Sequence, residues 1–228
     1  MTRPAPQPAA PPLTWETLAD RAAAEGLWAI GGFPAEAGDD LPEGTRTLVL
    51  LAPREPGFWP RVTAAPEFAD GRPDPLDRWS RRVVGRLACG LGAKALFPFS
   101  GPPWRPFISW ALRTGRIHQS PVGLLVHAEA GLYVSLRGAL ALREAIDGPP
   151  PLPAPCETCA DKPCLTACPV GALGAEGYDI PACRAFLAAP EGAGCMEAGC
   201  AVRRACPAGA GHGRRPDQSA FHMRAFLG

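Results

Sequence analysis

Eight of the nine cysteines in this 228-residue chain lie after residue 155, and their spacing is the strongest chemical signal in the sequence. The first four form a Cys-x2-Cys-x4-Cys-x3-Cys-Pro run, and the last three form a Cys-x4-Cys-x5-Cys-Pro run, with one cysteine between the two runs. Thiolates in this number are the ligands of iron–sulfur clusters or of zinc. The sequence therefore predicts metal chemistry in its C-terminal third.

The spacing within the runs favours iron–sulfur clusters over zinc. Three close cysteines can surround one cluster from a single loop, and a fourth cysteine followed by proline typically ligates the other cluster of a pair. Structural zinc sites more often combine two separated Cys-x2-Cys pairs. We therefore predict two [4Fe–4S] clusters with ligands that cross between the halves. Cluster 1 is assigned to Cys156, Cys159, Cys164 and Cys206, and cluster 2 to Cys168, Cys183, Cys195 and Cys200.

Two points in this assignment are less direct. Cys183 lies well ahead of the final run and joins cluster 2 by elimination, because Cys89 is the one other cysteine. We interpret Cys89 as an ordinary thiol that binds no metal. A zinc-stapled structural or nucleic-acid-binding protein, or a set of disulfides, stays open as the alternative.

Composition and charge limit the class of protein. The net charge is +1 and 46% of residues are hydrophobic, which is enough for a globular core. The sequence contains no apolar run of 18 residues, so we expect no membrane segment, and its start does not resemble a secretory signal. We therefore expect a cytoplasmic protein, in which clustered cysteines bind metal more often than they form disulfides.

Proline marks the boundaries of the elements that position the cysteines. We predict a disordered Pro-rich tail over residues 1–14, an α/β (α+β) domain over 15–148, a Pro-rich linker over 149–155, and a small bacterial-ferredoxin-like dicluster domain over 156–228. In the first domain, periodicity predicts helices over 15–25, 77–91 and 103–114 and strands over 27–30, 47–52, 95–99, 123–126 and 132–136. A last helix over 221–227 should pack on the second domain.

One basic segment stands out in this nearly neutral chain. Residues 78–128 carry 8 basic and no acidic groups, whereas residues 1–77 carry 6 basic and 12 acidic groups. The segment could bind an anion such as tRNA, a cobalamin phosphate or an acidic partner. Alternatively, it pairs with the acidic first 77 residues and lies near the negatively charged clusters, and we favour this interpretation over nucleic-acid binding.

The cysteine pattern resembles a known family. Residues 156–173 are similar to bacterial-type dicluster ferredoxin domains, and the displaced Cys183 resembles the arrangement in epoxyqueuosine reductases, which are cobalamin- and iron–sulfur-dependent enzymes of tRNA modification. Residues 48–53, 74–79 and 123–133 also resemble that family. The resemblance implies a cobalamin-binding first domain, with cobalamin as a further cofactor and His118 in a turn that faces it.

The chain also departs from the family's pattern. The family's proposed general acid, an Asp in an Asp-Ser-Ala-Pro stretch, is replaced here by Ser100-Gly101-Pro102-Pro103-Trp104. The family's Gly-Lys turn is replaced by His118-Gln119-Ser120-Pro121, and no Asp-x-His-x-x-Gly motif is present. We therefore expect the family's fold without its epoxide reduction.

These observations predict an iron–sulfur protein that transfers single electrons to a cofactor, substrate or partner at its first domain. A redox partner protein would supply the electrons. Arg184, Arg203 and Arg204 either tune the clusters through hydrogen bonds to sulfur or are surface residues. The alternative is a cobalamin-dependent reductase with a different substrate. No catalytic residue is identified, so the sequence leaves open whether the protein is itself an oxidoreductase enzyme.

Overall fold

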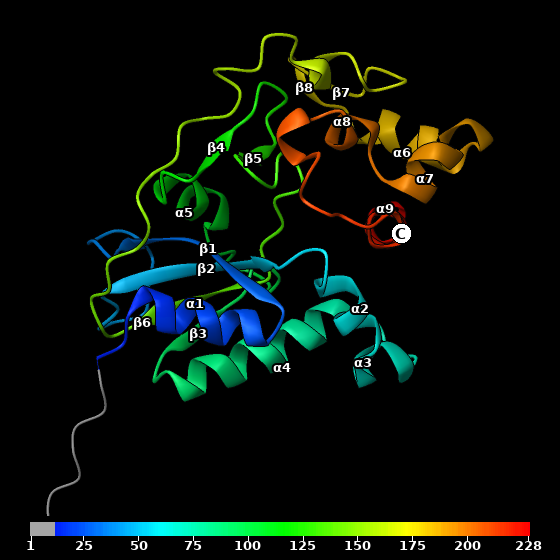
Figure 1. Cartoon of the computed structure of the whole chain (residues 1–228). Helices are drawn as coiled ribbons and strands as arrows, with labels where there is room; N and C mark the ends of the chain where they lie inside the picture. The colour runs from blue at the N-terminus through cyan, green and yellow to red at the C-terminus, as the bar shows by residue number, and fades with distance from the viewer. Residues whose placement is uncertain (1–11) are drawn as a thin grey trace, which may run out of the picture.

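The computed structural model describes residues 12–228, so most of the predicted tail lies outside the described residues (Figure 1). The fold is mixed α/β, as predicted. Its main sheet has the order β1 (Leu27–Pro34), β2 (Thr47–Pro53), β6 (Gly138–Leu142) and β3 (Lys94–Leu96). Each neighbouring pair in this sheet is antiparallel. Within residues 12–228, no helix has the length and apolar character needed to cross a membrane.

The central strand β2 is buried along its whole length because helices cover both faces of the sheet. Val49 and Leu51 pack with α1 (Trp15–Ala24) and α4 (Pro75–Gly90), together with α2 (Phe58–Thr63). Leu48 and Leu50 point to the opposite face, where α5 (Phe107–Arg113) contributes Phe107, Trp110 and Ala111. This alternation is the period-2 pattern of a strand that packs on both sides. Figure 1 shows α1 and α4 below the sheet and α5 above it.

Several predicted elements were placed wrongly, among them the last helix, which begins at Pro216 and not at 221, and the strand over 95–99, which is β3 and ends at Leu96. The strand predicted over 27–30 is β1, and it continues through Gly31 and Gly32 to Pro34. A Cβ at Gly32 would lie 2.8 Å from the Leu48 carbonyl oxygen, so glycine at this position permits the close pairing of β1 with β2. The helix predicted from 103 begins only at Phe107, since Pro106 disfavours helical geometry in the residue before it. The strand predicted over 132–136 is absent, and the chain instead pairs with the sheet over β6.

The basic segment is paired with the acidic start of the chain, as one of the two interpretations predicted. Arg82 binds Glu67 through two bonds of 2.5 and 2.9 Å and thereby joins α4 to α3 (Pro66–Ala69). The other pairs between these two parts of the chain are Arg78–Asp70, Arg86–Glu25, Arg105–Asp40, Arg113–Glu36 and Arg113–Asp39. These ion pairs involve most of the basic side chains of the segment, so the segment does not form a free cationic surface.

Two short strands, β4 (Ile117–Gln119) and β5 (Leu125–His127), form a hairpin between the sheet and the C-terminal third. The 149–155 segment has no regular secondary structure, as expected of a linker, but it is held in place along this hairpin. The Leu152 amide donates to the Gly115 carbonyl at 2.9 Å, and Arg116 donates to the Pro150 carbonyl at 2.7 Å. The linker is therefore a fixed strap that delivers the chain to the first cysteine.

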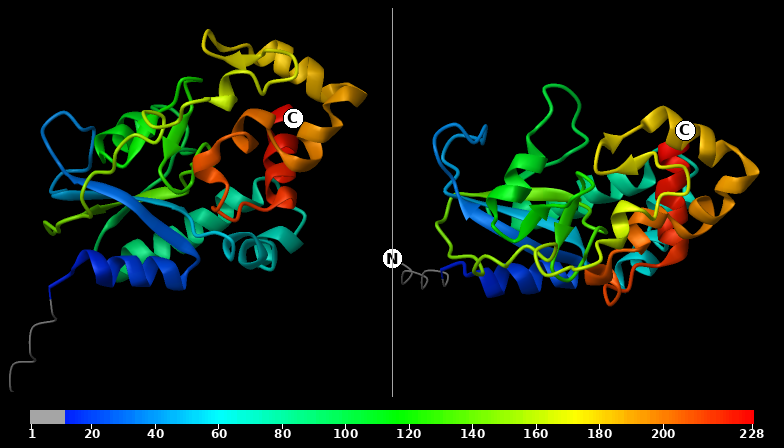
Figure 2. Two further views of the ribbon diagram at one scale, coloured as in Figure 1. Left: turned by 45° about the horizontal axis from the view of Figure 1, so that its top comes forward. Right: turned by 90° about the horizontal axis from the view of Figure 1, so that it is seen from above.

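The C-terminal third consists of short elements joined by tight turns. In order they are η1 (Pro163–Leu165), β7 (Leu173–Gly174), β8 (Gly177–Tyr178), α6 (Ile180–Ala188), η2 (Pro190–Gly192), α7 (Ala193–Ala198), α8 (Ala201–Arg204), η3 (Pro207–Gly209) and α9 (Pro216–Leu227). Figure 2 shows these elements gathered at one end of the main sheet. The terminal helix α9 packs on α7, as predicted for the last helix, but its Phe221 also contacts Trp59 of α2.

Candidate metal centres

The first candidate site is a cavity of about 230 Å³ that is lined by four cysteines from two distant parts of the chain. We call it the first cysteine cavity. Cys156 and Cys159 come from the turns after the strap, Cys164 from η1, and Cys206 from the residue that precedes η3. The opposite wall is the β4–β5 hairpin and the loop after it, which contribute Ser120, Pro121, Val126 and Leu132. The cavity is thus closed by both parts of the molecule.

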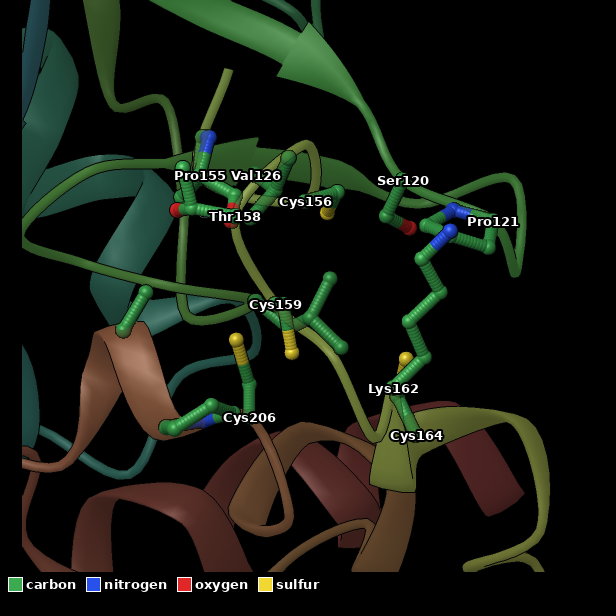
Figure 3. Close-up of a pocket in the computed structure, with 13 residues that line it drawn as sticks. Ser120, Pro121, Val126, Pro155, Cys156, Thr158, Cys159, Lys162, Cys164 and Cys206 are labelled. Atoms are coloured by element: carbon green, nitrogen blue, oxygen red, sulfur yellow. Dashed lines mark hydrogen bonds between the residues drawn. The ribbon is translucent and has the colours of Figure 1, made fainter. Parts of the chain in front are cut away.

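The sulfur atoms of these four cysteines face one open space (Figure 3). Lys162 and Ser120 lie along one side of it, and the Ser120 hydroxyl is buried without a hydrogen-bond partner in the described structure. A buried hydroxyl without a partner is uncommon in folded proteins. It is therefore available to donate a hydrogen bond to a group held in the cavity.

The other four C-terminal cysteines line a second, much smaller cavity of about 30 Å³, which we call the second cysteine cavity. Cys183 comes from α6, Cys195 from α7, Cys200 from the N-terminus of α8, and Cys168 from the loop after η1. Apolar side chains surround them, among them Leu173, Phe186, Leu187 and Val202. The structure thus groups the eight cysteines in the same two sets that the Cys-Pro spacing predicts, with Cys183 in the second set.

The distribution of sulfur atoms bears on the kind of metal. In residues 12–228, no three side chains of His, Cys, Asp or Glu converge closely enough to hold a single metal ion. A structural zinc ion would draw four thiolates to about 2.3 Å from one point. The four sulfur atoms of the first set surround a space of about 230 Å³. The donor chemistry of both sets fits a thiolate-bound cluster. The volume of the first cavity fits one as well, whereas the second, at about 30 Å³, is too small for a cluster unless its walls move apart.

The thiols themselves are perturbed by their surroundings. Burial raises the pKa of Cys156, Cys164 and Cys183, and the other thiols of each set add to the rise. All nine cysteines of the chain are free, and Cys89 is exposed on α4, away from both cavities. Cys89 therefore lies where a thiol that binds no metal should lie.

One sulfur contact was not found by sequence reasoning. The Tyr178 hydroxyl lies 3.4 Å from Cys183 Sγ and donates to it, and this contact helps raise the pKa of Tyr178. The only hint in the sequence was that one of the chain's two tyrosines lies five residues before Cys183.

Three arginines were candidates for hydrogen bonds to cluster sulfur. In this structure each of them donates to a backbone carbonyl group. Arg184 donates to Phe226, Arg203 to Leu132, and Arg204 to Gly199. His118, which the resemblance placed against a cofactor, forms a 2.8 Å hydrogen bond with the Leu152 carbonyl and so fastens the strap. Short loops bring these carbonyl groups within reach of the four side chains, and their roles beside clusters or a cofactor stay predictions. Ser120, Pro121 and Val126 of the basic segment line the first cysteine cavity, but none of the eight basic side chains of residues 78–128 lines either cysteine cavity.

Comparison with known proteins gives no further guide, since no protein family, no curated protein and no solved structure matches this chain.

Proposed function

We propose that this protein binds two [4Fe–4S] clusters in a ferredoxin-like C-terminal domain and transfers single electrons. The observation that carries the proposal is the grouping of eight cysteines around two cavities in the crossed sets that a two-cluster protein requires. Cluster 1 would be held by Cys156, Cys159, Cys164 and Cys206, and cluster 2 by Cys168, Cys183, Cys195 and Cys200. When bound, the clusters would supply one-electron chemistry.

The chain's own residues would insulate and orient this chemistry. The β4–β5 hairpin covers the first cysteine cavity with Val126, and the following loop adds Leu132; both side chains are fully or almost fully buried. Apolar cover of this kind excludes water and raises the effect of each nearby dipole on the reduction potential. A redox partner protein in the cytoplasm is the expected electron donor.

The cobalamin-dependent alternative receives less support. The cavity where the first domain meets the C-terminal third measures about 460 Å³, a volume typical of sites for drug-sized molecules. A cobalamin, with its corrin ring and nucleotide tail, is much larger. The basic segment that could have bound its phosphate is largely paired with acidic side chains. We therefore do not propose cobalamin as the acceptor.

Metal content tests the proposal. Protein purified without oxygen, from cells supplied with cobalamin, should contain about eight iron atoms per chain. Cys206→Ala removes one ligand of the first set and should lower the iron to about four, whereas Cys89→Ala changes an exposed thiol and should leave it at about eight. Zinc in place of iron would overturn the proposal, and about one cobalt per chain would restore the cobalamin alternative.

A further inference from the structure

The structure contains a third cavity, distinct from both cysteine cavities, where the first domain meets the loop after Cys206. This interface cavity has a volume of about 460 Å³. Its first-domain wall is Trp28 of β1, Arg54 and Glu55 after β2, and Glu129 after β5; its other wall is Ala208, Gly211 and His212. It therefore combines an indole, an imidazole, a guanidinium and two carboxyl groups around one space.

The two rings that line the interface cavity are held in place by further rings behind them. The centroids of Trp28 and His212 are 6.3 Å apart with planes at 41°. His212 stacks on Tyr133 at 6.5 Å and 17°, and Trp28 meets the edge of the buried His127 at 4.9 Å and 88°. Supported rings lose little entropy when a ligand binds. The Trp28 indole offers a flat face to a planar conjugated molecule, and His212 is inclined to that face by 41°.

The interface cavity is adjacent to the first cysteine cavity. Ala208, two residues after Cys206, lines both of them. The packing here leaves no room for an additional side chain, since a Cβ at Gly131 would lie 3.0 Å from Cys206 Sγ and would overlap the Gly209 backbone. A molecule in the interface cavity would thus be separated from the first set of cysteines by little more than one residue.

We propose that the interface cavity binds a planar heteroaromatic molecule of the isoalloxazine class, which stacks on Trp28 and contacts the inclined ring of His212. The identification of this molecule as the electron acceptor rests on the proposed function, because a donor of single electrons needs an acceptor that takes them one at a time, and flavins do so. Arg54 is exposed at the rim and forms no ion pair among the described contacts, so it is placed to bind an anionic side arm.

Binding of FMN and riboflavin to the intact, anaerobically purified protein tests the inference. Quenching of flavin fluorescence should reveal binding of both, and Trp28→Leu and His212→Ala should each weaken it at least tenfold, since each removes one ring that contacts the flavin. Trp28→Phe keeps a ring and should retain most of the affinity. Arg54→Gln should weaken FMN but not riboflavin, which lacks the phosphate.

Trp104→Leu is the matched control, since this indole is 66% exposed and does not line the cavity. Absence of binding by either flavin, or equal affinity in Trp28→Leu and the parent protein, would overturn the inference. Iron is measured on the same samples, which separates the two proposals. Protein with iron but no flavin binding contradicts only this inference, and protein that binds flavin but has no iron contradicts only the proposed function.

Discussion

Single polar side chains beside the two cysteine sets would tune the reduction potentials of the proposed clusters. Hydrogen bonds to cluster sulfur favour the reduced, more negative state and raise the reduction potential. The structure offers two hydroxyl groups in such positions: Ser120 in the first cysteine cavity and Tyr178 beside Cys183. The cysteine spacing predicted which cysteines line each cavity, but it missed these two neighbours because a hydroxyl has no spacing rule of its own.

Removing the Tyr178 hydroxyl should therefore lower the potential of cluster 2. Tyr178→Phe deletes the donor 3.4 Å from Cys183 Sγ and keeps the ring that stacks on Phe226. A hydrogen bond worth about 0.5–1.5 kcal/mol corresponds to about 20–60 mV for one electron. A redox titration followed by electron paramagnetic resonance measures the shift. Ser120→Ala is the reciprocal control, because it should lower only the reduction potential of cluster 1. An unchanged reduction potential of cluster 2 in Tyr178→Phe would refute the role of the Tyr178 hydroxyl.

At the scale of elements, periodicity located the long segments and failed at the short ones. The helix that begins at Pro75 and the strand over Thr47–Pro53 were predicted within two residues, because each has a continuous apolar pattern. β4 was missed altogether, since its three residues, Ile-His-Gln, form no apolar run. Its partner β5 was predicted over 123–126 and lies at Leu125–His127. The cover of the first cysteine cavity could therefore not be derived from sequence, although the grouping of its cysteines could.

The turn after β5 depends on a histidine that cannot easily take up a proton. His127 is fully buried, and its Nδ1 accepts a hydrogen bond from the Glu129 amide at 3.1 Å. Burial lowers the pKa of His127 to about 4, and the nearby Arg116, His212 and His118 act in the same direction. The unfolded chain, with an ordinary histidine pKa, then binds more protons than the folded one below neutral pH. Stability must fall as the pH falls from about 7 towards 4.

His127→Asn should remove this contribution, because asparagine can offer an oxygen to the Glu129 amide and does not titrate. Between about pH 7.5 and pH 6, His127 alone should cost the parent protein about 0.8 kcal/mol of its free energy of unfolding. Urea unfolding at the two pH values measures the difference, and the pH-dependent loss should be smaller in the variant by this amount. An equal loss in both proteins would show that His127 is protonated in the folded state.

For the molecule as a whole, the C-terminal helix joins the two parts that the sequence divided. Phe221 of α9 lies 5.1 Å from Trp59 of α2 and 5.6 Å from Phe68 of α3, ring centre to ring centre. The same helix packs on α7 within the C-terminal third. A division at the Pro-rich segment alone misses this contact, because a pattern of prolines reports chain stiffness and not which distant side chains meet. The interface cavity and the first cysteine cavity both require the two parts to stay together.

Phe221→Ala should loosen the two parts from one another. The side chain is partly buried, so its removal should cost about 1.5–3 kcal/mol, less than the 3–5 kcal/mol of a fully buried phenylalanine. Hydrogen exchange should then rise both in α9 and in residues 58–69, since each loses the other's cover. Phe226→Ala is the matched control on the same helix: Phe226 stacks on Tyr178 at 6.0 Å, so exchange should rise near Tyr178 but not in residues 58–69. Identical exchange patterns in the two variants would mean that α9 does not couple the first domain to the C-terminal third. The strap and the β4–β5 hairpin alone would then hold Ala208, which lines both the first cysteine cavity and the interface cavity, in place.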